Sequence, residues 1–354
     1  LPLQEFERAA RHYVARVRAE CATMLDVGSG EYLDVLEACI SLQDLEGQPA
    51  WPKIRAALRP SHYRHKGHHP APCAVIAGGP ASGRSLLIAR LARQCAIESR
   101  GDFLPLLIRG CDVANLPGPP VAAALSHAVI DQSCGCGQRA LMLRQAIAAR
   151  RVLFLIDSPE AAGPLADRLV AHAAQLAVLG HRVIVTITVD GRLDAPETFP
   201  SCLFSRCRLG LLTHAQQRRL VEHKLETVAD ADDAMALLER LGEAARVPQV
   251  FCMVLEHLRD RPDCSSLGEV YARVFPRLLR NAAARREVSQ EAATTVVTQA
   301  LRTLEALSFQ AQFRNSSHLR YSPVAPAAGW DDLLAFQSSG LLPILSVRIP
   351  EDPD

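Results

Sequence analysis

The amino-acid sequence predicts an α/β fold in which a parallel sheet is flanked by helices and followed by a helical region. Two observations carry this prediction. Between residues 73 and 212, short and continuously apolar runs alternate with amphipathic helical segments. Strands that are apolar throughout are typical of a parallel sheet covered on both faces. A glycine-rich stretch, GGPASGRS at 78–85, joins the first apolar run to a helical segment.

The composition is typical of a packed globular protein whose positive and negative charges nearly balance. The chain has 354 residues, of which 49% are hydrophobic and 22% charged, so we expect two or three domains. Lys and Arg number 39 against 38 Asp and Glu, which argues against a nucleic-acid partner. The chain begins with Leu1 rather than Met, and we expect it to be a fragment of a longer protein.

The sequence contains no targeting or spanning segment that we could identify. No apolar stretch approaches the roughly 20 residues that cross a bilayer, and residues 1–20 lack the apolar core of a signal peptide. The 11 cysteines are scattered without a framework, as buried thiols in a reducing compartment are. We therefore expect a cytoplasmic location.

The elements follow in order along the chain. Apolar residues at helical spacing in 3–24 and again in 32–42 predict an N-terminal helical segment over 1–60, and the His- and Pro-rich stretch 59–72 indicates a linker. Strands are predicted at 73–77, 103–110, 151–157 and 182–189, and helices at 84–97, 121–132, 139–150 and 164–179. From residue 212 onward, helices are predicted at 212–225, 233–246, 248–259, 267–284 and 289–309, and a strand or hairpin at 340–349. The first of these helices opens with a capping box, Thr213 and Gln216.

The glycine-rich stretch fits a phosphate-binding loop of the pattern G-x4-G-[K/R]-S, because it follows a buried strand and precedes a helix. Glycines let the backbone N–H groups approach phosphate oxygens, and the helix N-terminus adds a favourable dipole. Ser85 stands where a hydroxyl ligates Mg²⁺. The alternative is a glycine-rich turn without a ligand. The expected phosphate-binding residues are Gly78, Gly79, Pro80, Ala81, Ser82, Gly83, Arg84, Ser85 and Leu86.

Arg84 departs from the usual pattern, which has lysine at this position. Its guanidinium keeps the positive charge and can contact β- and γ-phosphate oxygens, yet it is longer, planar and forked. The substitution is therefore expected to preserve nucleotide binding better than catalysis, because catalysis requires the cation to meet the charge of the transition state in one particular geometry. The alternative is a disabled site.

Asp157 ends the apolar run RVLFLID, and Glu160 follows three residues later. Asp157 is expected to hold Mg²⁺ through water, and Glu160 to orient or deprotonate an attacking water. The alternatives are a helix cap for Asp157 and a solvent-exposed first-turn residue for Glu160. We assign no site to the four histidines within 62–69 or to Cys134 and Cys136, whose spacings fit a solvated linker and free thiols.

At these residues the sequence resembles the NACHT subgroup of STAND-type P-loop ATPases, which are regulated molecular switches. The resemblance rests on the loop 78–85 and on Ser158, since a tiny residue after the metal-binding aspartate is a hallmark of NACHT modules. The family's further acidic pair falls on Glu160 and Ala161, so one acid is replaced. Residues 182–189 resemble the family's sensor strand, which normally ends in an arginine. Here Thr188 takes the place of that arginine, and Arg192 lies nearby in the sequence.

The resemblance extends to the C-terminal half. Residues 206–225 resemble the strand and helix that begin the family's first helical domain, and Pro248 would pack near the adenine. Residues 266–279 and 338–342 resemble winged-helix portions. The resemblance thus implies a P-loop NTPase (NACHT-like) domain at 61–212, a helical domain at 213–263 and an incomplete winged-helix-like domain at 264–354.

The function implied by this resemblance is an ATP/ADP-binding switch in signal transduction. Mg²⁺ would be its cofactor, and slow ATP hydrolysis would control domain rearrangement and self-association. One alternative is a degenerate, non-hydrolysing NACHT scaffold, indicated by Arg84, Ala161 and Thr188. Another is an unrelated P-loop enzyme such as a small-molecule kinase.

Overall fold

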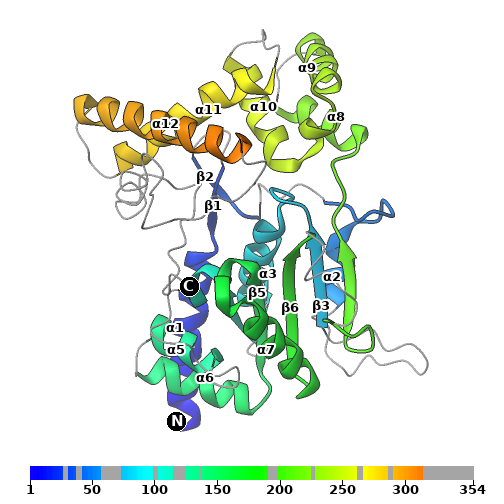
Figure 1. Ribbon diagram of the computed structural model, residues 1–354. Helices are drawn as coiled ribbons and strands as arrows, with labels where there is room; N and C mark the ends of the chain where they lie inside the picture. The colour runs from blue at the N-terminus through cyan, green and yellow to red at the C-terminus, as the bar shows by residue number, and fades with distance from the viewer. Residues whose placement is uncertain are drawn as a thin grey trace. The chain divides into compact units, whose positions relative to one another are not determined.

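The computed structural model describes residues 1–26, 31–36, 42–56, 73–98, 103–114, 125–134, 137–189, 198–224, 228–260, 266–285 and 290–313 (Figure 1). The chain divides into two compact units, one formed by 1–24 and 33–216 and the other by 25–32 and 217–354.

Figure 1 labels most of the elements from the N-terminus to the last strand of the central sheet. In chain order they are α1 (Leu3–Glu20), β1 (Thr23–Leu25), β2 (Tyr32–Asp34), α2 (Ala50–Ala56), β3 (Cys73–Gly78), α3 (Arg84–Glu98), β4 (Leu104–Arg109), α4 (Gly110–Ala114), α5 (Leu125–Cys134), α6 (Gln138–Ala148), β5 (Val152–Asp157), the 3-10 helix η3 (Pro159–Leu165), α7 (Ala166–Val178), β6 (Arg182–Thr188) and β7 (Phe204–Arg208). The helical elements that follow are α8 (His214–Lys224), α9 (Val228–Leu241), the 3-10 helix η4 (Gly242–Arg246), α10 (Pro248–Asp260), α11 (Leu267–Arg285) and α12 (Gln290–Phe313).

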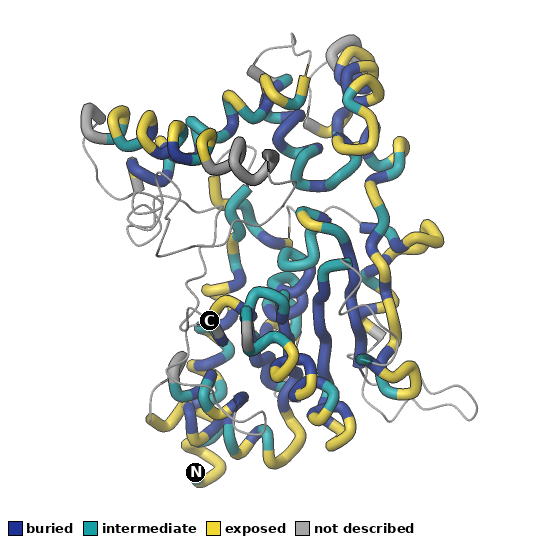
Figure 2. Tube along the Cα trace, viewed as in Figure 1, coloured by how far each residue is buried: buried dark blue, intermediate teal, exposed yellow. Residues whose placement is uncertain are grey.

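The central sheet has five strands in the order β4-β5-β6-β3-β7. Every neighbouring pair in it runs parallel, so the predicted parallel α/β fold is confirmed. All residues of β3 and β5 are buried (Figure 2), which explains why both strands are continuously apolar. β7 lies at the edge and has only two buried residues.

Helices cover both faces of this sheet. The connection from β3 to β4 carries α3, which contacts β3, β4, β5 and β6. The connections from β4 through β5 to β6 run across the sheet in the opposite direction and carry α6 and α7. Because parallel crossovers are right-handed, opposite directions place their helices on opposite faces. The result is a three-layer unit in which helices cover the central strands on both sides.

Helix α1 belongs to this unit, where it contacts β4, α3 and α6. The hydroxyl of Tyr13 donates to the Pro105 carbonyl of β4 at 2.8 Å, so α1 is fixed beside an edge strand that would otherwise lie open.

The helix that we predicted over 32–42 is wrong at its start. Tyr32–Asp34 form β2, which pairs with β1 in a two-stranded sheet. Two contacts hold the segment extended: the Val35 N–H donates to the Ala22 carbonyl at 2.9 Å, and Arg93 of α3 lies 2.6 Å from the Asp34 carboxylate. These tertiary contacts outweigh the local helical periodicity.

The helices predicted after residue 212 are present as α8 to α12, with η4 closing the predicted segment 233–246. The capping box forms as expected: the Gln216 N–H donates to Thr213 Oγ1 at 3.3 Å, and the Thr213 N–H donates to Gln216 Oε1 at 2.8 Å. None of the described helices is apolar and long enough to cross a membrane. The expectations for the histidines of 62–69, Cys136, Arg192, 338–342 and 340–349 fall outside the described residues.

Candidate nucleotide site

The candidate site lies where the central strands end. Parallel strands present their carboxyl ends at one edge of a sheet, which is where α/β folds bind ligands. Gly78 at the end of β3 is paired with Thr188 at the end of β6, and β5, which ends at Asp157, is the next strand beyond β6. The topology therefore brings the glycine-rich loop, Asp157 and the end of β6 together.

The loop has the backbone that a phosphate cradle requires. Gly83 has φ +87°, a left-handed conformation that favours glycine. Ala81 is also left-handed, at φ +61°, which is uncommon for a residue with a side chain. A Cβ added to Gly78 would lie 2.5 Å from Ser82 Oγ, so a larger residue there would displace the Ser82 side chain. Tight turns of this kind let backbone N–H groups converge on one point.

Ser82 and the start of α3 supply donors at this point. Ser82 is buried, and its hydroxyl makes no hydrogen bond with any described residue. α3 begins at Arg84, and the bond from the Leu87 N–H to the Gly83 carbonyl, at 3.0 Å, closes its first turn. The N–H groups before it have no acceptor within the helix. Of the remaining loop residues, Ser85, Leu86 and Gly79 are half-buried and Pro80 is exposed.

Arg84 reaches across the edge of the sheet to Glu160. Its Nη1 lies 3.2 Å from Glu160 Oε1, and the two side chains are only 10% and 23% exposed. The Thr188 hydroxyl donates to the same carboxylate oxygen. Glu160 is thus held by the loop and by β6, and the interpretation of it as a solvated first-turn residue does not fit this environment.

Asp157 is oriented by two hydroxyl groups. Thr186 Oγ1 donates to Asp157 Oδ1 at 2.6 Å, and Ser158 Oγ donates to the same oxygen at 3.4 Å. The Thr186 hydroxyl in turn accepts the Ser158 N–H at 2.9 Å. Asp157 accepts no backbone N–H from the 3-10 helix that follows, so the interpretation as a helix cap is not supported within the described residues. Its second oxygen, Oδ2, accepts no hydrogen bond from a described residue.

The chain turns sharply after Asp157. Ser158 has φ +51°, and its carbonyl would lie 2.1 Å from a Cβ added to Gly110. Gly110 therefore allows α4 to pack directly against this turn. We did not single out Gly110 from the sequence; the only signal was a glycine directly after an apolar strand.

A segment before β3 supports the loop and was also missed. A Cβ added to Gly83 would lie 3.2 Å from Leu42 Cδ1, so Leu42 packs against the loop. Its chain is tied to the end of β7, since the Leu45 N–H donates to the Arg208 carbonyl and the Gly210 N–H to the Gln43 carbonyl, both at 3.0 Å.

Asp44 stabilises the turn of this segment. Its Oδ1 accepts the N–H groups of Glu46 and Gln48 at 3.0 and 2.8 Å, and its Oδ2 accepts Lys53 Nζ. The hydrogen bond from Lys53 is the main reason why the Asp44 pKa lies below its ordinary value. The carboxylate form therefore fixes the segment that supports the loop.

Pro248 is the first residue of α10, where the missing N–H of proline costs no helical hydrogen bond. It belongs to the second compact unit, and its expected role beside an adenine stays a prediction. Among the described residues, no group of three or more His, Cys, Asp or Glu side chains could hold a metal ion. The metal site predicted here differs from such a cluster, because its protein ligands are one hydroxyl and one carboxylate.

No protein-family model matches the sequence, and no curated protein matches it. Among solved structures, the chain is similar to one described as the structural basis for katanin self-assembly, with 16% identity and a TM-score of 0.39 over 71% of this chain and 79% of that chain. It is also similar to the Orc1 protein of Aeropyrum pernix in complex with DNA, with 13% identity and a TM-score of 0.42 over 82% of this chain and 81% of that chain. Neither similarity assigns a ligand or an activity to this chain.

Proposed function

We propose that this chain is a switch module that binds ATP and ADP at the loop Gly78–Leu86 and hydrolyses ATP slowly. The observation that carries the proposal is the arrangement at the sheet edge, where the tight loop, Arg84, Asp157 and Glu160 are held together by the contacts described above.

Binding of phosphate is supported by the chain's own groups. The left-handed Gly83 and the side-chain-free Gly78 allow the tight turn of the loop, and Ser82 carries a buried hydroxyl without a hydrogen-bond partner among the described residues. The N-terminus of the 15-residue helix α3 adds positive potential. Arg84 supplies the cation, once its guanidinium leaves Glu160.

The residues present also fit Mg²⁺. Ser85 would contribute its hydroxyl, and Asp157 would hold the ion through water, using the oxygen that Thr186 and Ser158 leave open. The ion would neutralise phosphate charge and polarise the bond to be broken. The hydroxyls of Thr186 and Ser158 keep the Asp157 carboxylate in one orientation, as hydrogen-bonded outer residues do for metal ligands.

Slow turnover is supported by the state of Glu160. A general base must have a free lone pair within reach of the water it deprotonates. Here Arg84 and Thr188 both engage Oε1, and Oε2 is buried away from solvent, so the base is paired with the phosphate-binding cation and shielded from water. Hydrolysis then requires Arg84 to move from carboxylate to phosphate first.

The choice of adenine, the role of Pro248 and self-association rest on the resemblance to NACHT modules. In that account, exchange of ADP for ATP changes the arrangement of the domains and exposes a surface for a second copy of the chain. Signal transduction would be its biological setting.

The proposal is tested by titrating ATP and ADP with Mg²⁺ by calorimetry and by identifying any nucleotide that denaturation releases. At a ligand concentration about 100 times Kd, linkage adds about 2.7 kcal/mol to the stability of the binding state. We expect bound ADP or ATP and a saturable heat. No heat and no shift in melting at millimolar nucleotide would refute the proposal.

A second function deserves a separate test because Arg84 is already paired. If the Arg84–Glu160 ion pair is permanent, the chain is a scaffold that no longer binds nucleotide. This function would be supported if the purified chain contains no nucleotide and its melting temperature does not change when ATP is added. Turnover of many ATP per second would instead select a conventional P-loop enzyme.

A further inference from the structure

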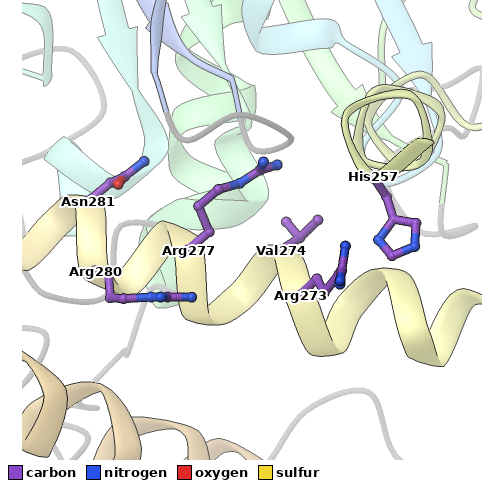
Figure 3. Close-up of a pocket in the computed structure, with 6 residues that line it drawn as sticks. All are labelled: His257, Arg273, Val274, Arg277, Arg280 and Asn281. Atoms are coloured by element: carbon purple, nitrogen blue, oxygen red, sulfur yellow. The ribbon is translucent and has the colours of Figure 1, made fainter. Parts of the chain in front are cut away.

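A cavity of about 410 Å³ lies in the helical unit, within the size range of pockets for small molecules. Figure 3 shows the six residues that line it, with one on α10 facing five on α11. They are His257, Arg273, Val274, Arg277, Arg280 and Asn281. No carboxylate is among these lining residues.

The three arginines occupy one face of α11. They are separated by four and three positions, and residues at such spacings are neighbours on a helix surface. Like charges at these spacings destabilise a helix, so the cluster does not favour helix formation. An anion that contacts all three would remove the repulsion.

Two of the arginines have donors to spare. Arg273 makes no ion pair or hydrogen bond with any residue in the part of the chain that the structure describes. Arg280 donates from Nε to the Pro276 carbonyl at 3.2 Å, a contact along its own helix that leaves both Nη groups as donors. Arg273 is half-buried and Arg280 is exposed, so a ligand can reach the cluster from the solvent.

The other lining residues give the cavity fixed walls. His257 is 5% exposed and Val274 is 1% exposed, so both are anchored in the core of the helical unit, where α10 and α11 are in contact. Asn281 is half-buried and adds an amide one residue after Arg280. The cavity therefore combines a rigid inner wall with cationic donors around it.

We propose that this cavity binds a small molecule that carries two or more phosphate groups. Guanidinium forks match phosphate oxygens with paired hydrogen bonds. Arg273 and Arg280 are seven residues apart, or about 10 Å along the helix, so each guanidinium can pair with a different phosphate of one ligand. Successive phosphates of a polyphosphorylated molecule cover that span.

This site is independent of the nucleotide site proposed above, since its residues lie on α10 and α11 and none comes from the loop 78–86. The test uses the full chain and inorganic tripolyphosphate as the probe. Every variant carries Arg84→Ala, which weakens any binding of the probe to the loop. The variants compared with this background are R273Q/R280Q, and R302Q as a control, because Arg302 is an exposed arginine of α12 outside the cavity.

We expect the background and the R302Q control to bind one tripolyphosphate with equal affinity, measured by calorimetry. R273Q/R280Q should bind it at least about tenfold more weakly, since each arginine supplies charge-assisted hydrogen bonds. Circular dichroism shows whether the double variant folds; if it does not, R273K/R280K keeps the charges, and its loss of the paired hydrogen bonds should still weaken binding several-fold.

Three results would overturn the proposal: no binding by the background, equal affinity for the background and R273Q/R280Q, or tighter binding of a triglutamate peptide than of tripolyphosphate. The last result would assign the cavity to an acidic protein segment. Failure of the nucleotide site would leave this comparison unaffected, because the loop is already weakened in every sample.

Discussion

Arg84 Nη1 lies 3.2 Å from Glu160 Oε1, so the cation at the lysine position of the loop is bound to the carboxylate expected to act as base. The two residues are 76 positions apart and come from the start of α3 and the first turn of η3. In the absence of a ligand, the two side chains are therefore paired with each other. A phosphate that enters the loop has to compete with Glu160 for Arg84.

Glu160→Gln should tighten ATP binding and abolish residual hydrolysis. The amide removes the competing negative charge, and the release of a partly buried ion pair worth about 1 kcal/mol corresponds to an affinity gain of about fivefold. Turnover is lost because an amide cannot accept the proton of water. Calorimetry and a phosphate-release assay measure the two effects; weaker ATP binding by this variant would mean that Glu160 supports the ligand.

Substitution of Arg84 tests the cation directly. Arg84→Ala should weaken ATP binding by about tenfold or more, because it removes charge-assisted hydrogen bonds to phosphate. Arg84→Lys should retain binding and raise turnover, since it restores a compact ammonium. Equal affinity of the wild type and Arg84→Ala would show that Arg84 serves only the ion pair with Glu160.

Two glycines of the loop provide a matched pair. Gly83→Ala places a side chain at φ +87° and 3.2 Å from Leu42, so it should distort the loop, lower the melting temperature and remove ATP binding. Gly79→Ala meets nothing within 4 Å and has no positive φ, so it should keep the melting temperature of the wild type. Equal losses in both variants would contradict a role for the left-handed turn in the cradle.

The sequence predicted the elements whose burial is uniform. β3 and β5 are buried on both faces, so their apolar runs identify them as strands. β7 is an edge strand with three exposed residues, and only the family resemblance pointed to it. The helix expected at 32–42 failed because Leu33 and Leu36 fit a helical spacing, whereas the pairing with β1 and the Arg93–Asp34 contact decide the conformation.

The candidate site residues could be chosen from the sequence, but their contacts could not. Strand ends at Gly78, Asp157 and Thr188 follow from the apolar runs, and a parallel sheet brings such ends to one edge. The direction in which Arg84 extends depends on packing between distant segments, which no local pattern encodes. The same holds for Leu42 under the loop and for the close approach of Gly110 to Ser158.

Asp157→Asn should impair the Mg²⁺-dependent part of nucleotide binding. The amide keeps an oxygen that can accept from Thr186, so the turn after β5 is preserved, but it removes the charge that the ion requires. We expect the Kd for ATP with Mg²⁺ to rise to the value that the wild type shows in EDTA, and binding in EDTA to stay unchanged. An undiminished effect of Mg²⁺ in this variant would place the metal ligand elsewhere.

His172 is a buried histidine in the core of the sheet unit, and its titration should make the free energy of unfolding depend on pH. Its imidazole is 4% exposed, and Nε2 lies 2.5 Å from the hydroxyl of buried Ser126. Burial lowers the pKa of His172 from 6.5 to about 4, so the folded state keeps the ring neutral while the unfolded state takes up a proton below pH 6.5. Stability is therefore lost as pH falls through the window from 6.5 to 4, by about 2 kcal/mol between pH 7.5 and 5. Urea unfolding of His172→Gln should show a loss smaller by that amount, because the amide does not titrate. His12→Gln, at an exposed position of α1, should follow the wild type. Parallel pH profiles for the wild type and His172→Gln would show that the ring is protonated in the folded protein as readily as in the unfolded chain.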